Sequence, residues 1–397
     1  MEIKRNMIPF REALETIKRF ARTPGTEQVD LLYALSKTLA EDVFSDISMP
    51  PFNKSAMDGF ACRKSDLKNT LQVIEEIPAG TIPVKTVGEN QCARIMTGAM
   101  VPEGADFVIM KEDIEEIASD LVRCTRETNK TNICYTGEDV KSGDLVLNKG
   151  DIISPAHIAI LASVGCTKPL VYKLPSVAII STGDELVEPD EKPGISKIRN
   201  SNSYQLMAQN QQLGITPDYL GIVTDDENSV KNILTLALER YDVIIISGGV
   251  SVGDFDFVPK ILNQLNVNIR VHGMDVRPGK HLLFGERVHH YVFGMPGNPV
   301  SSFVQFEVLV KPFLNTLMGK TAEEAFLHLP IEGEYLRKKG DQLVFVPVSL
   351  TKKGTVLPLE YHGSAHIHAY SFAQGIMEIP KGISFIKKGE TVCVRPL

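Results

Sequence analysis

Acidic side chains, glycines and two cations recur in five short loops of the second half of the chain. The loops are Ser181-Thr-Gly-Asp-Glu185, Thr224-Asp-Asp226, the segment 247–256, Arg277-Pro-Gly-Lys280 and Met295-Pro-Gly-Asn-Pro299. Crowded carboxylates repel one another unless a cation lies between them, and carboxylate oxygens are preferred ligands of Mg²⁺. Arg277 and Lys280 offer donors to a phosphate or another oxyanion. The mixture predicts a site for a magnesium-bound phosphate ligand; the alternative is a solvated loop edge with helix caps and surface charge.

The loop 247–256 follows the most apolar short run of this region. Positions 243–246 are all β-branched, which is typical of a strand covered on both faces by helices. Gly248 and Gly249 then permit positive φ and let a ligand approach the backbone amides. An ordinary turn between strand and helix is the alternative for any single Gly-Gly pair, so the neighbouring loops decide the interpretation.

Strand-like and helix-like segments alternate from residue 175 onward. The predicted strands are 177–181, 217–223, 242–247, 268–274 and 291–295, and the predicted helices are 202–213, 227–240, 258–265 and 299–318. Such alternation predicts a mostly parallel sheet with helices on both faces, which binds ligands beyond the carboxyl ends of its strands. The five loops are therefore expected to be neighbours in space.

The rest of the chain has a different rhythm. An amphipathic helix is predicted over 9–22, a second helix over 27–39, and another over 158–164. Short extended runs separated by Gly, Pro and Asn fill 71–147 and predict a small β domain. Strands predicted at 343–350 and 391–395 indicate a small C-terminal β-barrel.

These patterns predict a multidomain α/β fold with four parts. They are a mixed linking domain (1–47 and 138–174), an inserted small β domain (48–137), a three-layer α/β/α domain with a mostly parallel sheet (175–326) and a C-terminal β-barrel domain (327–397).

Composition excludes several classes of protein. The 397 residues are 43% hydrophobic and 23% charged, enough apolar material for real cores, and the net charge of −7 argues against a nucleic-acid partner. No apolar run is long enough to span a bilayer, and the amino terminus lacks the apolar core of a signal peptide. We therefore expect a cytoplasmic protein without membrane contact.

Neither the cysteines nor the histidines form a convincing metal motif. The six cysteines are scattered without a C-x-x-C pair, which favours free structural thiols over a zinc site or a disulfide framework. His362, His366 and His368 have extended spacing and no nearby carboxylate or cysteine cluster, which favours loop or strand histidines over metal ligands.

Three polar residues of the first half stand at tight turns. Asp58 precedes a glycine, Thr97 precedes another, and Asp139 ends the run Thr136-Gly-Glu-Asp139. Each alone is more often a cap, turn or connecting residue than a site residue.

Seven motifs in the same order together resemble the molybdopterin molybdenumtransferase (MoeA) family, which includes the carboxyl-terminal part of gephyrin. They are Pro51-Phe-Asn-Lys-Ser-Ala-Met-Asp-Gly-Phe60, Ile95-Met-Thr-Gly98, Gly137-Glu-Asp139, Ser181-Thr-Gly-Asp-Glu-Leu186, Ser247-Gly-Gly-Val-Ser-Val-Gly-Asp254, Arg277-Pro-Gly-Lys280 and Pro296-Gly-Asn-Pro299. The resemblance covers nearly the whole chain.

The resemblance implies a four-domain, elongated homodimer. Such an enzyme inserts molybdenum from molybdate into adenylylated molybdopterin, with Mg²⁺, and releases AMP. In that family the site lies between the α/β domain and the inserted and C-terminal regions of the dimer partner. Transient contact with the molybdopterin adenylyltransferase and with molybdoenzyme-maturation proteins is also expected.

Matching by motif also assigns site residues. The implied catalytic residues are Asp58, Thr97, Asp139, Glu185, Asp225 and Asp256, of which Glu185 and Asp256 are the expected magnesium ligands. The implied substrate-binding residues are Gly248, Gly249, Ser251, Arg277, Lys280, Pro296, Pro299 and Ser364. Val346 lies near a position where members often carry an arginine, which puts in question what the C-terminal domain, including Ser364, contributes.

Two alternatives from other classes stay open. The α/β domain also resembles that of molybdopterin adenylyltransferases, but the inserted domain and the loop 296–299 with a C-terminal barrel favour the molybdenumtransferase. A non-catalytic, gephyrin-like scaffold would instead show an exposed apolar groove and would tolerate loss of the carboxylates.

Overall fold

A computed structural model describes residues 7–126, 129–250, 257–321, 325–360 and 363–397. Contacts divide the chain into two compact units. The first consists of Met1–Ala40, Gly150–Ser154 and Pro169–Leu397, and the second of Glu41–Lys149 and Pro155–Lys168. The boundaries of the four predicted domains stay a prediction.

A six-stranded, mostly parallel sheet forms the centre of the first unit, as predicted. Its order is β16 (Asp218–Val223), β13 (Val177–Thr182), β17 (Val243–Ser247), β21 (His290–Met295), β20 (Leu283–Arg287) and β18 (Asn268–His272). The first four strands run parallel, and β20 is antiparallel to both of its neighbours. Strand β20 was not predicted, because Gly285 interrupts its apolar run. A Cβ at Gly285 would lie 2.6 Å from Cγ1 of Val267, so close packing requires the glycine.

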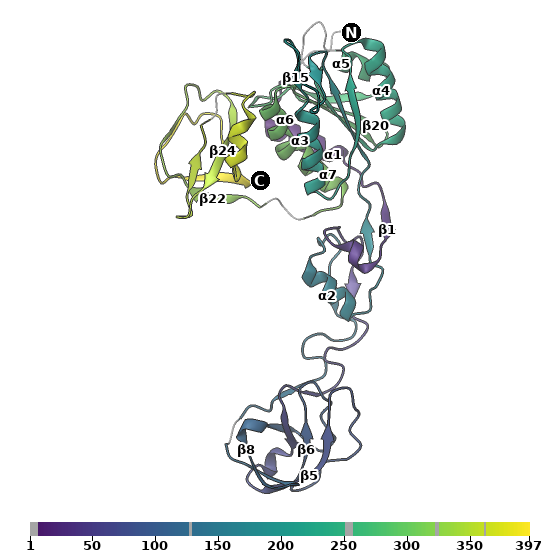
Figure 1. The fold of residues 1–397 in the computed structure, drawn as a ribbon, viewed down its shortest axis with the longest axis vertical. Helices are drawn as coiled ribbons and strands as arrows, with labels where there is room; N and C mark the ends of the chain where they lie inside the picture. The colour runs from purple at the N-terminus through teal and green to yellow at the C-terminus, as the bar shows by residue number, and fades with distance from the viewer. Residues whose placement is uncertain (1–6, 127–128, 251–256, 322–324, 361–362) are drawn as a thin grey trace. The chain divides into compact units, whose positions relative to one another are not determined.

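Helices cover both faces of this sheet, which confirms the predicted three layers (Figure 1). Val243 and Ile245 of β17 pack on one side with α1 (Phe10–Phe20), α3 (Asn202–Gln212), α6 (Pro299–Gln305) and α7 (Lys311–Leu317). Ile244 and Ile246 pack on the other side with α4 (Glu227–Arg240) and α5 (Val258–Gln264). This two-sided burial explains why β17 is apolar at consecutive positions.

The segment predicted as one helix over 299–318 contains a π-helical turn. Helix α6 passes into the turn Phe306–Val310 and then into α7. Pro312 lacks an N–H group, so the α-helical bond to the carbonyl of Val308 cannot form. The residue before this proline, Lys311, makes the π-helical bond, because its amide donates to the carbonyl of Phe306, five residues back.

The helix predicted over 27–39 is wrong. The segment begins with the strand β1 (Thr26–Gln28), which pairs with β12 (Leu170–Tyr172), and continues as a single 3₁₀ turn over Leu31–Ala34. Ser36 adopts a φ of 65°, which ends any helix. Pairing with a distant part of the chain has outweighed the local apolar spacing.

The C-terminal part of the first unit is a small β-barrel. Its sheet contains β22 (Leu327–Pro330), β24 (Leu343–Leu350), β25 (Val356–Pro358), β26 (Gly375–Ile379) and β28 (Thr391–Pro396). A bridge between Ile331 and Val356, with the amide of Glu332 donating to the carbonyl of Val356, joins the two ends of the sheet. Among the predicted loop histidines, His366 and His368 lie at the 3₁₀ helix Ile367–Phe372, and His362 lies outside the described residues.

The second unit contains the predicted small β domain. Its six-stranded sheet has the order β7 (Phe107–Met110), β4 (Gly59–Cys62), β6 (Gln91–Ile95), β5 (Thr70–Ile77), β9 (Leu121–Cys124) and β8 (Ile114–Ala118). Short pairs of β2 (Val43–Phe44) with β11 (Leu145–Leu147) and of β3 (Lys54–Ser55) with β10 (Ile133–Cys134), together with α2 (Pro155–Ser163), complete the unit.

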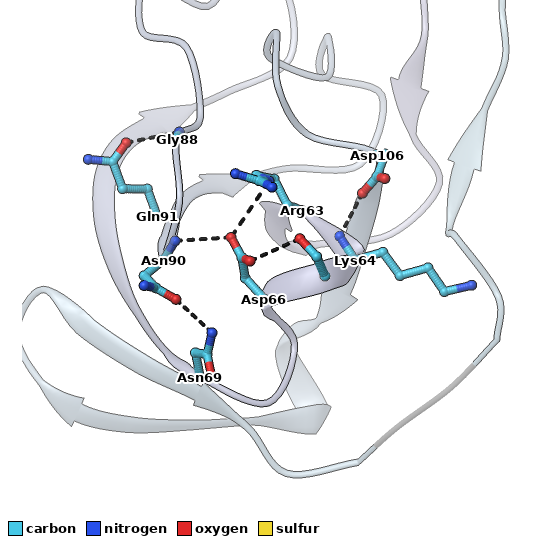
Figure 2. Close-up of polar contacts among 9 residues, drawn as sticks. Arg63, Lys64, Asp66, Asn69, Gly88, Asn90, Gln91 and Asp106 are labelled. Atoms are coloured by element: carbon cyan, nitrogen blue, oxygen red, sulfur yellow. Dashed lines mark hydrogen bonds and ion pairs between the residues drawn. The ribbon is translucent and has the colours of Figure 1, made fainter.

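A buried carboxylate holds together two turns of this β domain (Figure 2). Asp66 accepts hydrogen bonds from the amide of Asn90 (3.0 Å) and the hydroxyl of Ser65 (2.9 Å), and its Oδ2 lies 3.8 Å from the guanidinium of Arg63. The amide hydrogen bond is the main reason why the pKa of Asp66 is lowered. Asp66 is therefore a structural residue that fixes the connection into β6.

The cysteines are free thiols, and two of them lie opposite each other on β4 and β6. Burial raises the pKa of Cys62 and raises that of Cys92 to about 12. Such thiols are unreactive packing residues.

No helix in the described part of the chain has the length and apolarity needed to cross a membrane.

Candidate functional site

The strand register brings four of the predicted site loops to one edge of the six-stranded sheet. Ser181 of β13 lies opposite Ser247 of β17, and Ser247 lies opposite Met295 of β21. Thr182 of β13 lies opposite Val223 of β16. Since neighbouring strands lie about 4.8 Å apart, the loops that follow them originate along an edge of roughly 15 Å. This confirms the expectation that these loops are neighbours.

Gly248 and Gly249 begin the loop after β17, and both need to be glycine. Their φ angles are 99° and 64°, and a Cβ at Gly248 would lie 2.4 Å from the carbonyl oxygen of Thr182. The amide of Gly248 donates to the carbonyl of Met295 (3.1 Å), so this loop is tied to the neighbouring strands. Ser251 and Asp256, predicted for the same loop, lie outside the described residues.

Three carboxylates gather where β13 and β16 end. The amide of Asp225 donates to Oδ1 of Asp184 (3.2 Å), and the exposed Glu185 follows Asp184 in the chain. Burial raises the pKa of Asp225, and the negative charges of Asp184 and Glu185 raise it further. A cation at this position would relieve the repulsion. Within the described ranges, however, no three His, Cys, Asp or Glu side chains are grouped closely enough to hold a metal.

A tyrosine-rich network, which the sequence analysis missed, anchors the segment after Glu185. Glu188 accepts hydrogen bonds from the hydroxyls of Tyr219 (2.7 Å) and Tyr204 (3.1 Å), and the amide of Asn200 donates to Tyr219 (2.8 Å). Burial, followed by the interaction with Glu188, raises the pKa of Tyr219. The two tyrosines come from α3 and β16, so no local pattern indicates that they meet.

The loop Arg277–Lys280 is placed differently from our expectation. It follows a short strand, β19 (Val276–Arg277), that pairs with Leu343 and Val344 of β24 in the C-terminal barrel, not with the six-stranded sheet. The amide of Met274 donates to the carbonyl of Lys280 (3.0 Å) and closes the loop. The side chain of Gln305 in α6 supports it by donating to the carbonyl of Pro278 (3.0 Å).

A cavity of about 580 Å³ nevertheless brings this loop together with the edge of the sheet. Its lining contains the predicted residues Arg277, Lys280, Pro296 and Ser364. It also contains polar residues that were not predicted, namely Asn298, Ser301 and Gln342. Asn298 lies within a recognised motif and Ser301 just after it, whereas Gln342 precedes an apolar strand and gave no sequence signal.

Ser364 connects the C-terminal domain to the loop after β21. Its hydroxyl accepts a hydrogen bond from the side-chain amide of Asn298 (3.0 Å), and its carbonyl accepts one from the amide of Val300 (3.0 Å). Pro299 is the first residue of α6 and does not line the cavity. Val346 is 1% exposed in the core of the barrel. The C-terminal domain therefore contributes to the cavity through Gln342, Gly363 and Ser364.

In the second unit, a separate carboxylate, that of Asp58, is bound by two donors from Thr97, a pair of hydrogen bonds that we call the Asp58 clasp. Oδ1 of Asp58 accepts hydrogen bonds from the amide (2.8 Å) and the hydroxyl (2.7 Å) of Thr97. These two bonds, the amide first, lower the pKa of Asp58. Oδ2 lies 3.7 Å from Nζ of Lys111. Both Asp58 and Lys111 line a cavity of about 450 Å³ together with Arg94 and Glu116.

Asp139 lies exposed on a turn of the same unit. The amide of Asp139 donates to the carbonyl of Met49 (3.1 Å), and the amide of Thr136 donates to the side chain of Asn53 (2.9 Å). The turn is thus fixed to the segment that leads to Asp58. Asp139 is not among the residues that line the cavity at Asp58.

Models of three protein families match consecutive parts of the chain. The MoeA N-terminal region (domain I and II) matches residues 8–165, a probable molybdopterin-binding domain matches 178–316, and the MoeA C-terminal region (domain IV) matches 331–397.

Known proteins resemble the chain over almost its full length. A molybdopterin molybdenumtransferase of Staphylococcus epidermidis is 35% identical over 403 aligned residues, covering 98% of this chain and 96% of that protein. One of Staphylococcus aureus is 34% identical over 401 residues, covering 98% and 95%. The crystal structure of a molybdopterin biosynthesis MoeA protein from Pyrococcus horikoshii OT3 has a TM-score of 0.85 at 30% identity, covering 99% of this chain and 100% of that chain.

Proposed function

The chain belongs to the MoeA family of molybdopterin molybdenumtransferases, and from this premise we propose how its residues carry out the reaction. The protein is an enzyme of molybdenum-cofactor biosynthesis that inserts molybdenum into molybdopterin. We propose that the molybdenum comes from molybdate, that the acceptor is adenylylated molybdopterin, and that AMP is released in the presence of Mg²⁺. The observation that carries this proposal is the meeting of acidic loops and a cation-lined cavity at one edge of one sheet.

The acidic part of the edge suits a metal-bound phosphate. Glu185 and Asp225 offer carboxylate oxygens, and burial, followed by the negative charges of Asp184 and Glu185, raises the pKa of Asp225. We propose that Glu185 and Asp256 hold Mg²⁺, with Asp225 beside them, although Asp256 lies outside the described residues. The metal, when bound, would spread the negative charge of the bridging phosphates.

The cavity at Arg277 suits an oxyanion. Arg277 and Lys280 are exposed cations on one loop, and the polar residues Asn298, Ser301 and Ser364 line the same cavity. A tetrahedral oxyanion such as molybdate is bound by donors and cations of this kind. We assign this cavity to molybdate and the adjoining edge, with Gly248 and Gly249, to the pterin nucleotide.

We further propose that a homodimer completes the site. Asp58, Thr97 and Asp139 lie in the second unit, and Asp58 is already oriented by Thr97. If these residues act on the α/β domain of the partner subunit, two inactive variants, Asp58→Ala and Asp225→Ala, should partly restore activity after subunit exchange. With one variant isotopically labelled, so that mixed dimers can be recognised by mass, verified exchange without any recovered activity would place the whole site in one chain.

The test of the function is a defined reaction. Purified protein should convert adenylylated molybdopterin and molybdate, with Mg²⁺, into AMP and molybdenum cofactor. AMP release that does not depend on molybdate would contradict the proposed coupling. The absence of any product would favour the scaffold interpretation.

Two variants test the division of the edge into a metal side and an oxyanion side. Asp256→Asn should raise the Mg²⁺ concentration needed for activity, whereas Arg277→Ala should raise the molybdate concentration needed and leave the Mg²⁺ requirement near its original value. Equal shifts of the same titration in both variants would show that the division is wrong.

A further inference from the structure

The loop that carries Arg277 and Lys280 is held by contacts that begin two residues earlier, at Asp275. The amide of Asp275 donates to the carbonyl of Ile8 (3.0 Å), and the next two residues form β19 against the C-terminal barrel. The backbone on both sides of the Asp275 side chain is therefore fixed.

Both carboxylate oxygens of Asp275 are bound by the C-terminal domain. Nε2 of Gln342 donates to Oδ1 (2.8 Å), and Nζ of Lys381 donates to Oδ2 (3.1 Å). The Gln342 hydrogen bond is the main reason why the pKa of Asp275 is lowered, and the charges of Lys381 and Lys280 act in the same direction. Asp275 is thus ionised at neutral pH, and its hydrogen bonds are charge-assisted.

Gln342 also lines the cavity that contains Arg277 and Lys280. The loop Arg277–Lys280, here called the cation loop, follows Asp275 and lines the cavity. The side chain of Gln342, which is bound to Asp275, belongs to a residue that also lines it. A shift of Asp275 would therefore change the cation loop and the Gln342 amide together. Lys381 does not line this cavity, so its contact with the site passes through Asp275.

We propose that Asp275, bound by Gln342 and Lys381, is a positioning residue that orients the Arg277–Lys280 loop toward the oxyanion. This inference rests on the assignment of the cavity to molybdate under the proposed function. It gives the C-terminal domain a defined role, which is to hold the cation loop of the α/β domain in its binding orientation.

Electrostatics alone makes the opposite prediction. A carboxylate near an anion site repels the anion, so neutralising a bystander aspartate should tighten molybdate binding. If Asp275 positions the loop, Asp275→Asn should weaken molybdate binding. A neutral amide group then faces the Lys381 cation, and the ion pair between residues 275 and 381 is lost. The sign of the change therefore separates the two roles.

The experiment measures molybdate binding to the full-length protein by calorimetry, together with the melting temperature. Asp275→Asn and Lys381→Met should each weaken binding about tenfold, because both break one connected network. The double variant should be no weaker than Asp275→Asn. Lys381→Arg, which keeps the cation, should bind nearly as well as the wild type. Asp341→Asn, the matched control, removes the same charge from an exposed residue next to Gln342 and should leave binding unchanged or slightly tighter.

The outcomes are distinguishable. Wild-type or tighter binding by Asp275→Asn overturns the positioning role alone. A wild-type protein that does not bind molybdate overturns the oxyanion assignment itself, and this inference with it. If Asp275→Asn does not fold, Lys381→Met at low and high salt provides the test, because the Lys381 side chain is 68% exposed and its loss leaves no buried gap. A loss of affinity relative to the wild type that persists at high salt supports positioning, and one that salt abolishes is screened charge alone and overturns it.

Discussion

Asp58 and Asp225 are both predicted site carboxylates, but their surroundings change their pKa in opposite directions. Two donors from Thr97 lower the pKa of Asp58, whereas burial and the neighbouring Asp184 and Glu185 raise that of Asp225. Asp58 is already satisfied by the protein and is oriented as an acceptor. Asp225 has carboxylate neighbours and is suited to a cation or a proton. Carboxylates predicted alike from sequence therefore have pKa values shifted in opposite directions, which their environments set.

The largest expected effect follows from removing the charge at Asp225. Asp225→Asn should lower activity by roughly 100-fold, a typical cost of losing one group that stabilises charge in the transition state. Its melting temperature should not fall, because the substitution also removes repulsion from Asp184 and Glu185. Steady-state kinetics and thermal unfolding measure the two quantities.

The neighbouring residue is the matched control for this change. Asp226 caps α4 by accepting hydrogen bonds from the amides of Asn228 and Ser229. The side chain of Ser229, then its amide and the hydroxyl of Thr224, lower the pKa of Asp226 to about 2. Asp226→Asn removes the same charge and keeps a capping side chain, so it should retain activity. Equal losses in both variants would reduce the role of Asp225 to general charge at the edge.

A smaller effect is expected at the Asp58 clasp. Thr97→Val removes the hydroxyl donor and keeps the amide donor, so the pKa of Asp58 should rise and activity should fall about tenfold. Thr97→Ser restores the hydroxyl and should restore both properties. The pKa is measured by NMR titration of the Asp58 carboxyl. A Thr97→Val enzyme with full activity and a raised pKa would show that the clasp is structural.

The features of the fold and the site that depend on local sequence patterns were predicted from the sequence. The alternation after residue 175 predicted the parallel sheet, and the register of β13, β17 and β21 then placed the motif loops together as expected. Asp58 and Thr97 were predicted from separate motifs, and the structure places them within hydrogen-bonding distance. Buried runs and turn glycines are local signals, so they can be read from the chain alone.

The parts that the sequence did not predict depend on contacts between distant segments. β19 is only two residues long, and its partner lies in the C-terminal barrel, so nothing local indicates that the cation loop joins that barrel. The same holds for Gln342, and for Asn202, whose amide joins the hydroxyl of Ser247 (2.9 Å) to the carbonyl of Gly297 (2.8 Å). The helix expected over 27–39 failed for a related reason, since its backbone pairs with β12.

The raised pKa of Asp225 also predicts a dependence of stability on pH. Its folded-state pKa lies above the ordinary value of 3.8, so ionisation opposes folding. Below pH 3.8 the carboxyl is protonated in both states and this cost is absent. The free energy of unfolding of the wild type should therefore fall relative to Asp225→Asn as pH rises from that value through the folded-state pKa, and the difference should then stay constant. Denaturant unfolding across this range measures it, and a wild type that instead gains stability relative to Asp225→Asn as pH rises would contradict the prediction.

The smallest expected effect concerns Lys111, the cation beside Asp58. Nζ of Lys111 lies 3.7 Å from Oδ2, and both side chains are substantially exposed, so solvent and salt screen the pair. Lys111→Met should raise the pKa of Asp58 by less than Thr97→Val does, because the Thr97 hydrogen bonds are the larger cause of the lowered value. The shift should shrink as salt is added, whereas the shift caused by Thr97→Val should persist. NMR titrations of both variants at low and high ionic strength test this ranking. If Lys111→Met gave the larger shift, the charge of Lys111 would outweigh the Thr97 hydrogen bonds at Asp58, and the contrast with Asp225 would then rest on the sign of the neighbouring charge alone.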